Sequence, residues 1–173
     1  KEMSDINEKS GFAFTFQPVT KLFEEQVRLH PEKCAVASGK ESFTYAELNE
    51  RANKIAHSLI GKGAGREIIV GVVLERWCDF YAVRQGILKS GGAFAVASPD
   101  YPDDRIQFIF EDAGVPLLIT TKEIAKERKE LFDKLPCKVL LLEELLQHPD
   151  TENPDVEIRE HDLCYCIYTS GST

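Results

Sequence analysis

An uninterrupted apolar run at residues 68–74 constrains the fold more than any other part of this 173-residue chain. The run is rich in β-branched residues and too short for a buried helix, which favours a strand covered on both faces. Earlier in the chain, Thr44 and Glu47 have the spacing of a capping box. Apolar residues then recur at steps of three and four from Tyr45 to Leu59, which predicts an amphipathic helix.

Strand and helix patterns alternate along most of the chain. Further helices are expected at about 19–30, 80–88, 102–113 and 123–135, and further strands at 34–37, 94–97, 117–119, 138–142 and 163–168. This alternation, with strands apolar on both faces, predicts an α/β fold with a largely parallel sheet and flanking helices. Residues 1–17 are expected to form a linker or arm, and residues 18–173 the folded unit.

Charge and hydropathy narrow the classes of function. The formal net charge is -8, and lysines and arginines are scattered without a basic stripe, so no nucleic-acid partner is expected. The longest apolar runs fall far short of the roughly 20 residues of a membrane-spanning helix. No membrane association is expected, and without a recognisable secretory signal the predicted location is cytoplasmic.

The cysteines and histidines do not predict a metal site. No two of the five cysteines have the C-x2-C spacing of a zinc or redox motif. Cys164 and Cys166 are two apart in the expected strand 163–168, and we expect both to be buried packing residues on one face. The four histidines lie apart in the sequence, and each is expected to be a surface or capping residue, isolated from the others.

The candidate ligand site is the end of the chain, Thr169, Ser170, Gly171, Ser172 and Thr173, directly after the expected strand 163–168. In open α/β sheets, ligands bind beyond the carboxyl ends of strands. Hydroxyl side chains and glycine can present several N–H and O–H donors to a polyphosphate. Taken alone, the same composition is also typical of a plain polar turn. Neither a P-loop nor a G-x-G-x-x-G motif is present.

Three segments, in order, resemble the core motifs of nonribosomal peptide synthetase adenylation domains, which are adenylate-forming enzymes. Residues 43–53 resemble the first motif, and residues 168–173 resemble the opening of the third. The second motif is resembled by residues 88–94, followed by Pro99-Asp100-Tyr101-Pro102 and Arg105-Ile106. The resemblance runs from about Pro18 to the end of the chain. Segment 94–99 departs from the usual family pattern, and Trp77, Arg84 and Gln85 replace residues that are commonly smaller or more apolar.

The resemblance implies a two-step ligase. An amino acid carboxylate attacks ATP to give aminoacyl-AMP and pyrophosphate, and the acyl group passes to the phosphopantetheine thiol of a peptidyl carrier protein domain. Thr169, Ser170, Gly171, Ser172 and Thr173 carry over as the residues that bind the ATP phosphates. The implied partners are the carrier domain, a neighbouring condensation domain and a small MbtH-like protein, in antibiotic or secondary metabolite biosynthesis.

The resemblance also implies that essential parts lie downstream of Thr173. These are the catalytic residues, the Mg2+ ligand and the amino acid pocket, so this chain alone is expected to be inactive and to lack the residues that select the amino acid. Two alternatives stay open: an acyl- or aryl-CoA ligase of the same superfamily, and a noncatalytic scaffold or remnant.

Overall fold

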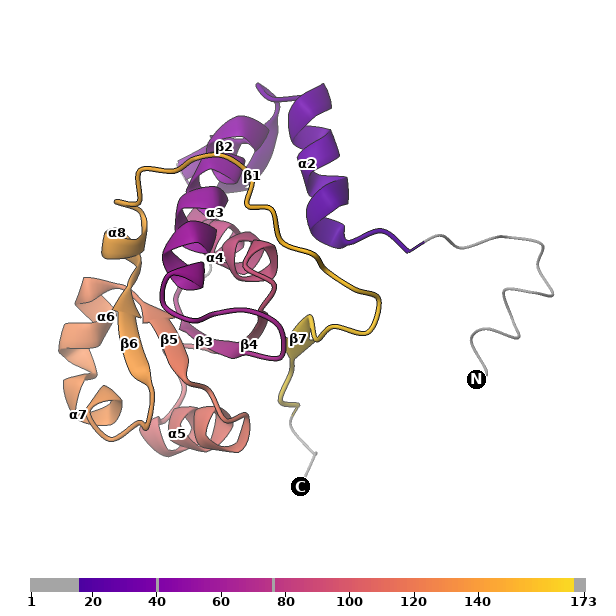
Figure 1. Cartoon of the computed structure of the whole chain (residues 1–173). Helices are drawn as coiled ribbons and strands as arrows, with labels where there is room; N and C mark the ends of the chain where they lie inside the picture. Colours follow the sequence, from indigo (N-terminus) through magenta and orange to yellow (C-terminus); the bar gives the residue numbers. More distant parts are fainter. Residues whose placement is uncertain (1–15, 40, 76, 170–173) are drawn as a thin grey trace.

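A five-stranded parallel sheet forms the centre of the molecule in the computed structural model, which describes residues 16–39, 41–75 and 77–169 (Figure 1). The strand order is β6-β5-β3-β4-β7, and every neighbouring pair is parallel. The strands are β3 (Ile69–Val73), β4 (Ala93–Ala97), β5 (Leu117–Thr120), β6 (Lys138–Leu141) and β7 (Tyr165–Cys166). The predicted α/β class is therefore confirmed, and the apolar run 68–74 provides the central strand, as expected from its residues.

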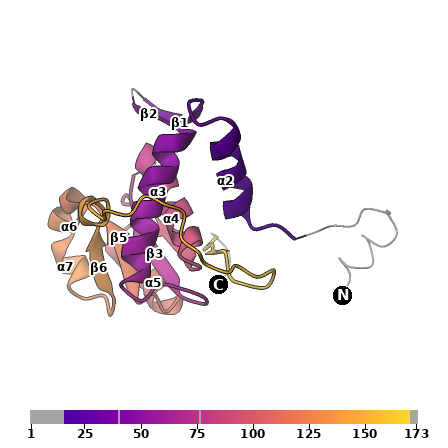
Figure 2. The same cartoon turned by 45° about the horizontal axis from the view of Figure 1, so that its top comes forward.

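Helices cover both faces of the sheet (Figures 1 and 2). They are α2 (Val19–Leu29), α3 (Tyr45–Ile60), α4 (Cys78–Lys89), α5 (Asp103–Asp112), α6 (Lys122–Glu127), α7 (Lys129–Phe132) and α8 (Leu142–Leu145). One hydrophobic core lies between the sheet and α3 with α4, and a second packs the opposite face against α5, α6 and α7. None of the described helices combines the length and the apolar character needed to cross a membrane.

Helix α3 begins and packs as its sequence predicts. The Thr44 N–H donates to Glu47 Oε2 at 2.8 Å and the Glu47 N–H donates to Thr44 Oγ1 at 3.2 Å, which completes the capping box. Leu48, Ile55 and Leu59 are buried in the core shared with α4. Because the helix start and the apolar stripe are local features, both could be read from the sequence.

A β-hairpin lies outside the main sheet. The expected strand at 34–37 is confirmed as β1 (Cys34–Ser38), but it pairs antiparallel with β2 (Glu41–Thr44), which the sequence did not predict. Gly39, at φ 63°, supplies a left-handed backbone conformation in the turn that follows β1. Strand β2 was missed because its short polar sequence has no apolar run, and its pairing to β1 provides the missing stabilisation.

The expected single helix over 123–135 is wrong. The structure has two short helices, α6 and α7, separated at Arg128, whose φ of -109° and ψ of 32° are not helical. The Arg128 guanidinium donates to the Tyr101 carbonyl at 3.0 Å and to Asp103 Oδ1 at 2.6 Å. These contacts reach a distant loop, so a helical pattern read along the sequence could not reveal the break.

The last expected strand is shorter than predicted, and the prediction that Cys164 and Cys166 are both buried is wrong. Strand β7 contains only Tyr165 and Cys166, which pair with β4 at the edge of the described sheet. Cys164 is exposed, and Cys166 is half-buried against the second core. The two cysteines are less buried than predicted because β7 is an edge strand, with a described neighbour on one side only.

Two histidines that were expected to be isolated form a pair. The rings of His57 on α3 and His148 after α8 are stacked, with centroids 5.4 Å apart and an interplanar angle of 13°. His57 Nε2 also lies 2.9 Å from the Glu152 carbonyl oxygen and 3.5 Å from Asp150 Oδ2. The segment after α8 crosses the α3 surface, and this long-range contact was invisible in the sequence.

Candidate functional site

The carboxyl edge of the sheet is where this fold can place a ligand. Because all five strands are parallel, the segments that leave β3, β4, β5 and β7 emerge at the same edge. The predicted phosphate-binding segment begins there, after β7. Of its residues, Thr169 is described and exposed, whereas Ser170, Gly171, Ser172 and Thr173 lie outside the described residues.

Tyr168 anchors the start of this segment to α5. Its hydroxyl donates a hydrogen bond to Asp112 Oδ2 at 2.6 Å, and its ring packs edge-on against Phe108 with centroids 6.0 Å apart. Burial and the hydrogen bond to Asp112 raise the pKa of the Tyr168 phenol well above its ordinary value. The hydroxyl therefore stays protonated and remains a donor at neutral pH.

Pairing to β4 fixes the approach of the chain to Tyr168. The Phe94 N–H donates to the Cys164 carbonyl at 3.3 Å, and the Phe94 and Tyr165 ring centroids are 5.9 Å apart. The Arg84 guanidinium lies over the Phe94 ring, 4.9 Å from its centroid. Arg84 thus has a packing contact beside β7 that its sequence position alone did not indicate.

The loop after β4 forms a second part of this edge. Arg128 binds it by donating to the Pro99 and Tyr101 carbonyls and to the Asp103 carboxylate. A cavity of about 770 Å³ lies beside it and is lined by residues of both charge signs, among them Asp100, Asp103, Lys126, Arg128 and Lys129. Arg128 and Lys129 are already paired with Asp103 and Asp133, and the lining also carries Asp100, Glu127 and Glu130, so this cavity does not favour a phosphate.

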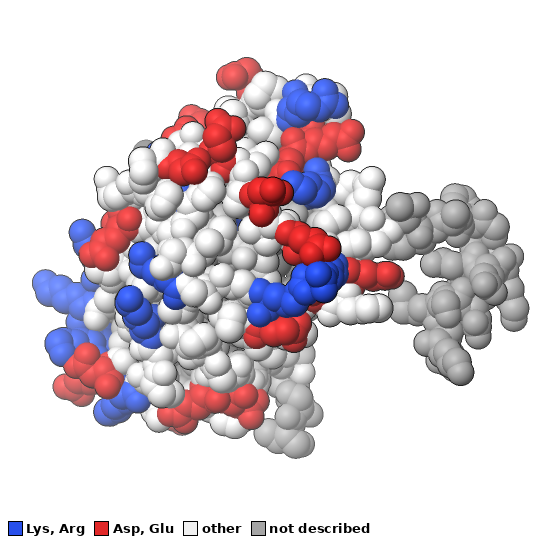
Figure 3. All heavy atoms as spheres, in the orientation of Figure 1, with Lys and Arg blue, Asp and Glu red and all other residues white. Residues whose placement is uncertain are grey.

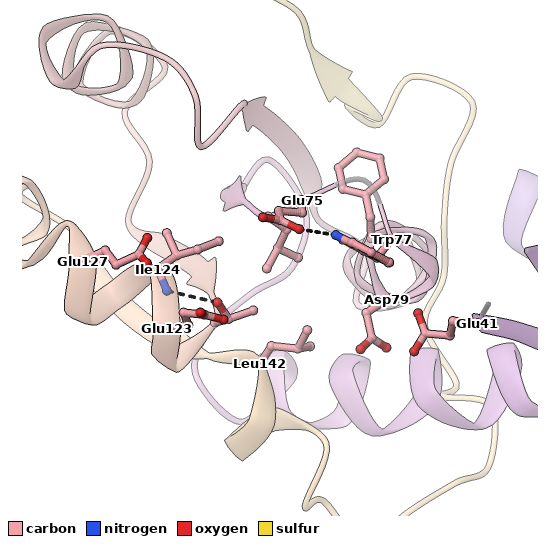
Figure 4. Close-up of a pocket in the computed structure, with 11 residues that line it drawn as sticks. Glu41, Glu75, Trp77, Asp79, Glu123, Ile124, Glu127 and Leu142 are labelled. Carbon is pink, nitrogen blue, oxygen red and sulfur yellow. Dashed lines mark hydrogen bonds between the residues drawn. The ribbon is translucent and has the colours of Figure 1, made fainter. Parts of the chain in front are cut away.

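A third part of the edge is a cavity of about 720 Å³ at the carboxyl ends of β3 and β5 (Figure 4). Five acidic side chains line it, together with apolar and aromatic ones, and no lysine or arginine belongs to its described lining. Four of these carboxylates have no described ion-pair partner, and carboxylates repel a triphosphate, so this described lining does not suit ATP phosphates. The sequence did not predict it, because its lining comes from separate segments of the chain.

The described surface and side chains give no separate metal centre. Acidic and basic side chains are interspersed on the described part of the face shown in Figure 3. Within residues 16–39, 41–75 and 77–169, no group of three or more His, Cys, Asp or Glu residues is arranged to hold a metal ion. The Mg2+ ligand expected downstream of Thr173 stays a prediction.

The fold and the sequence profile together define the class of protein. The profile of the AMP-binding enzyme family matches residues 23–173, so the chain belongs to this family. Among curated proteins, it is 41% identical over 155 residues to zwittermicin A synthase ZmaJ of Bacillus cereus, an alignment covering 90% of this chain and 29% of ZmaJ. It is 40% identical over 157 residues to gramicidin S synthase 2 of Brevibacillus brevis, covering 91% of this chain and 3% of the synthase.

Solved structures agree with this assignment. The nonribosomal peptide synthetase FmoA3, in its alpha-methyl-L-serine-AMP bound form, matches with a TM-score of 0.81 and 29% identity over 94% of this chain and 18% of FmoA3. VinN in complex with 3-methylaspartate matches with a TM-score of 0.76 and 26% identity, over 90% of this chain and 45% of VinN. The chain thus spans less than half the length of each of these four proteins.

Proposed function

We propose that this chain supplies the phosphate-binding portion of an enzyme that activates an amino acid as aminoacyl-AMP. The carboxylate oxygen of the amino acid attacks the α-phosphorus of ATP, a P–O bond forms, and pyrophosphate leaves. The observation that carries the proposal is the Tyr168–Asp112 anchor, which starts the hydroxyl-rich segment at the carboxyl edge of the sheet in a member of the AMP-binding enzyme family.

In this proposal, Thr169, Ser170, Gly171, Ser172 and Thr173 donate hydrogen bonds to the β- and γ-phosphates. Negative charge grows on the leaving pyrophosphate in the transition state, and preorganised donors stabilise that state more than the ground state. A magnesium ion bound by residues outside this chain would neutralise part of the phosphate charge.

The later steps and partners are part of the same proposal. The phosphopantetheine thiol of a carrier domain attacks the acyl carbonyl of aminoacyl-AMP, a thioester forms, and AMP leaves. The carrier domain lies beside a condensation domain, the reaction takes place in the cytoplasm, and an MbtH-like protein assists. Support comes from the likeness to peptide synthetases such as gramicidin S synthase 2. We further propose that residues 1–173 alone release no pyrophosphate from ATP with any of the common amino acids, since they span 29% of ZmaJ.

The test is ATP–pyrophosphate exchange by a longer protein that contains this chain, across a panel of amino acids and simple carboxylic acids. We expect exchange with an amino acid. In Ser170→Ala we expect the exchange rate to fall by about tenfold or more. One preorganised donor typically contributes about 2.7–4 kcal/mol of transition-state stabilisation, and here several donors contribute together, so the loss from one is smaller. Ser90→Ala is the matched control: Ser90 Oγ donates to the Ile87 carbonyl at 2.7 Å at the end of α4. It should leave exchange nearly unchanged.

Four outcomes would contradict the proposal. Exchange with simple carboxylic acids alone, followed by transfer to coenzyme A, would favour an acyl- or aryl-CoA ligase. Equal effects of Ser170→Ala and Ser90→Ala, or a Ser170→Ala effect on thermal stability without one on exchange, would reduce residues 169–173 to a structural turn. No exchange with any acid would favour a scaffold.

A further inference from the structure

The acidic cavity at the carboxyl ends of β3 and β5 has an apolar interior. Leu74, Ile124 and Leu142 line it and are 4%, 8% and 3% exposed. The aromatic rings of Trp77 and Phe80 complete the apolar lining from the start of α4. Its volume of about 720 Å³ is within the range of about 300–1,000 Å³ typical of small-molecule sites.

Carboxylates surround this apolar interior, as Figure 4 shows. The acidic residues are Glu41, Glu75, Asp79, Glu123 and Glu127. Arg51 neutralises Asp79 through an ion pair of 2.5 Å, but the four glutamates form no ion pair with a described lysine or arginine. Lys40 and Arg76, which adjoin Glu41 and Glu75 in the sequence, lie outside the described residues. The described lining therefore places four carboxylates that have no described ion-pair partner around apolar walls.

Trp77 gives the cavity an aromatic surface suited to a cation. The side chain is 50% exposed although it lies beside an apolar interior, and its Nε1–H donates to Glu75 (Figure 4). This hydrogen bond orients the indole beside a carboxylate. Tryptophan is the best aromatic partner for an ammonium or guanidinium group, and nearby carboxylates add to the same attraction.

We propose that this cavity binds a small organic cation, in which a primary ammonium or a guanidinium group is joined to an apolar body. The apolar body packs on Leu74, Ile124 and Leu142, and the cationic group lies between the Trp77 ring and the carboxylates of Glu75, Glu123 and Glu127. A ligand that also carries a carboxylate is excluded by repulsion from the same glutamates. The site requires no part of the adenylation reaction, so the two proposals can fail separately.

Trp77 also makes the site directly measurable, because it is the only tryptophan of the chain. The experiment titrates the 173-residue protein with phenylbutylammonium and follows tryptophan fluorescence, with equilibrium dialysis as a second measurement. Phenylbutanol and phenylbutyrate are matched probes of the same shape with neutral and negative groups. We expect saturable binding of the ammonium at least about tenfold tighter than that of the alcohol, weakening with added salt, and no binding of the carboxylate.

Charge variants distinguish attraction of the cation by the cavity carboxylates from attraction by the net charge of the protein. Glu123→Gln with Glu127→Gln removes two cavity carboxylates while preserving their shape. Glu25→Gln with Glu32→Gln removes two exposed carboxylates that do not line the cavity. We expect the first pair to weaken phenylbutylammonium binding by about tenfold and the second pair to change it less than twofold, since distant exposed charges are screened.

The opposite results would overturn the proposal. Equal affinity for the ammonium and the alcohol would make the cavity a nonselective apolar groove. Equal effects of the two double variants would assign the attraction to overall net charge. Absence of saturable binding in both fluorescence and dialysis would mean that the cavity takes no cation of this class.

Discussion

Gly86 shows how one residue sets the distance between two helices. A Cβ added at Gly86 would lie 2.7 Å from Ile55 Cγ2 and 2.9 Å from the backbone oxygen of Ala52. Helices α3 and α4 therefore approach so closely that only a hydrogen atom fits at this position. The backbone of α3 is rigid at Ala52, so it cannot move away as a flexible side chain could.

We expect Gly86→Ala to destabilise the protein by about 1–2 kcal/mol. Overpacking costs about 1–3 kcal/mol, and the better helix propensity of alanine returns up to about 1 kcal/mol. Urea denaturation measures the change in the free energy of unfolding. Gly65→Ala is the control, because nothing lies within 4 Å of a Cβ there and its φ is not positive. A stabilising Gly86→Ala would show that the helices separate easily.

Leu48 tests the buried face of α3. It is 5% exposed, within the core on the α3 and α4 side of the sheet. Leu48→Ala should lower the free energy of unfolding by about 2–5 kcal/mol, since it removes buried methyl groups and leaves a cavity. Leu22→Ala on α2, where the side chain is 45% exposed, should change it much less. Comparable losses in the two variants would contradict the assignment of faces.

These residues mark what the sequence could and could not predict. Leu48 was expected to be buried from its place in a periodic stripe, because periodicity is a local property. The close contact of Gly86 with Ile55 joins two helices, and no pattern within either helix contains it. The pairing of His57 with His148 was missed for the same reason.

At the scale of elements, one buried lysine joins three helices and a loop. Lys89, at the end of α4, has a side chain only 1% exposed and forms a 2.9 Å ion pair with Glu24 on α2. Its Nζ also donates to Asn153 Oδ1 at 2.7 Å, and Asn49 and Asn53 on α3 donate to the same oxygen. Without these acceptors a buried ammonium would be strongly unfavourable.

Burial shifts the pKa values of Lys89 and Glu24 in opposite directions, because it disfavours the charged form of each. Burial lowers the pKa of Lys89, against the opposing effect of Glu24. Burial alone would raise the pKa of Glu24, but hydrogen bonds and charges from Lys89 and Lys21 outweigh it and hold that pKa below its ordinary value. The Glu24 carboxylate therefore stabilises the fold above its unfolded pKa, and this contribution is lost as pH falls through its folded pKa.

Glu24→Gln should consequently destabilise the protein at neutral pH by about 3 kcal/mol, the low end of the range for removing one partner of a buried ion pair, because Glu24 is 13% exposed. Below the folded pKa of Glu24 the unmodified protein carries a neutral carboxyl there, so the difference should shrink towards zero. Urea denaturation at pH 7 and at a series of decreasing acidic pH values measures both. Glu25→Gln, at an exposed position of the same helix, should show neither effect. If the difference in free energy of unfolding between the unmodified protein and Glu24→Gln stays constant with pH, the charge of Glu24 does not stabilise the fold.

Helices and strands were predicted correctly where their own residues stabilise them. The strand at 68–74 and the helix from Tyr45 were found because composition and period agree with the final environment. The hairpin strand β2 and the break at Arg128 depend on partners elsewhere in the chain. Strand β7 was predicted too long because pairing with β4 extends over only two of its residues.

At the scale of the whole molecule, the parallel sheet brings the described cavities and the start of the predicted phosphate-binding segment to one edge. The alternation of strands and helices predicted this edge and the position of residues 169–173 on it. It could not predict the acidic cavity, because that cavity combines the ends of β3 and β5 with the starts of α4 and α6. The Tyr168 anchor was also missed, since Asp112 belongs to a helix far away in the sequence.

The hydrogen bond between Tyr168 and Asp112 can be tested in a longer protein that contains the chain. Tyr168→Phe keeps the ring contact with Phe108 and removes only the hydroxyl that donates to Asp112 at 2.6 Å. A hydrogen bond to a charged group contributes about 1.5–3 kcal/mol, and the exposure of Asp112 places this bond at the low end. If it orders residues 169–173 for ATP, the KM for ATP in pyrophosphate exchange should rise by about tenfold, with kcat little changed, since about 1.4 kcal/mol corresponds to tenfold.

A double-mutant cycle tests whether Tyr168 and Asp112 affect the KM for ATP through the hydrogen bond between them. Asp112→Ala should raise KM to a similar extent, and the double variant should be no worse than either single variant. Because the pKa of Tyr168 is raised, its hydroxyl donates throughout the range from neutral pH to its ordinary value of about 10, and its stabilising contribution is lost only above that. The KM difference should therefore be constant between pH 7 and pH 9. Additive effects of the two substitutions, or an unchanged KM, would show that α5 does not hold the start of the phosphate-binding segment.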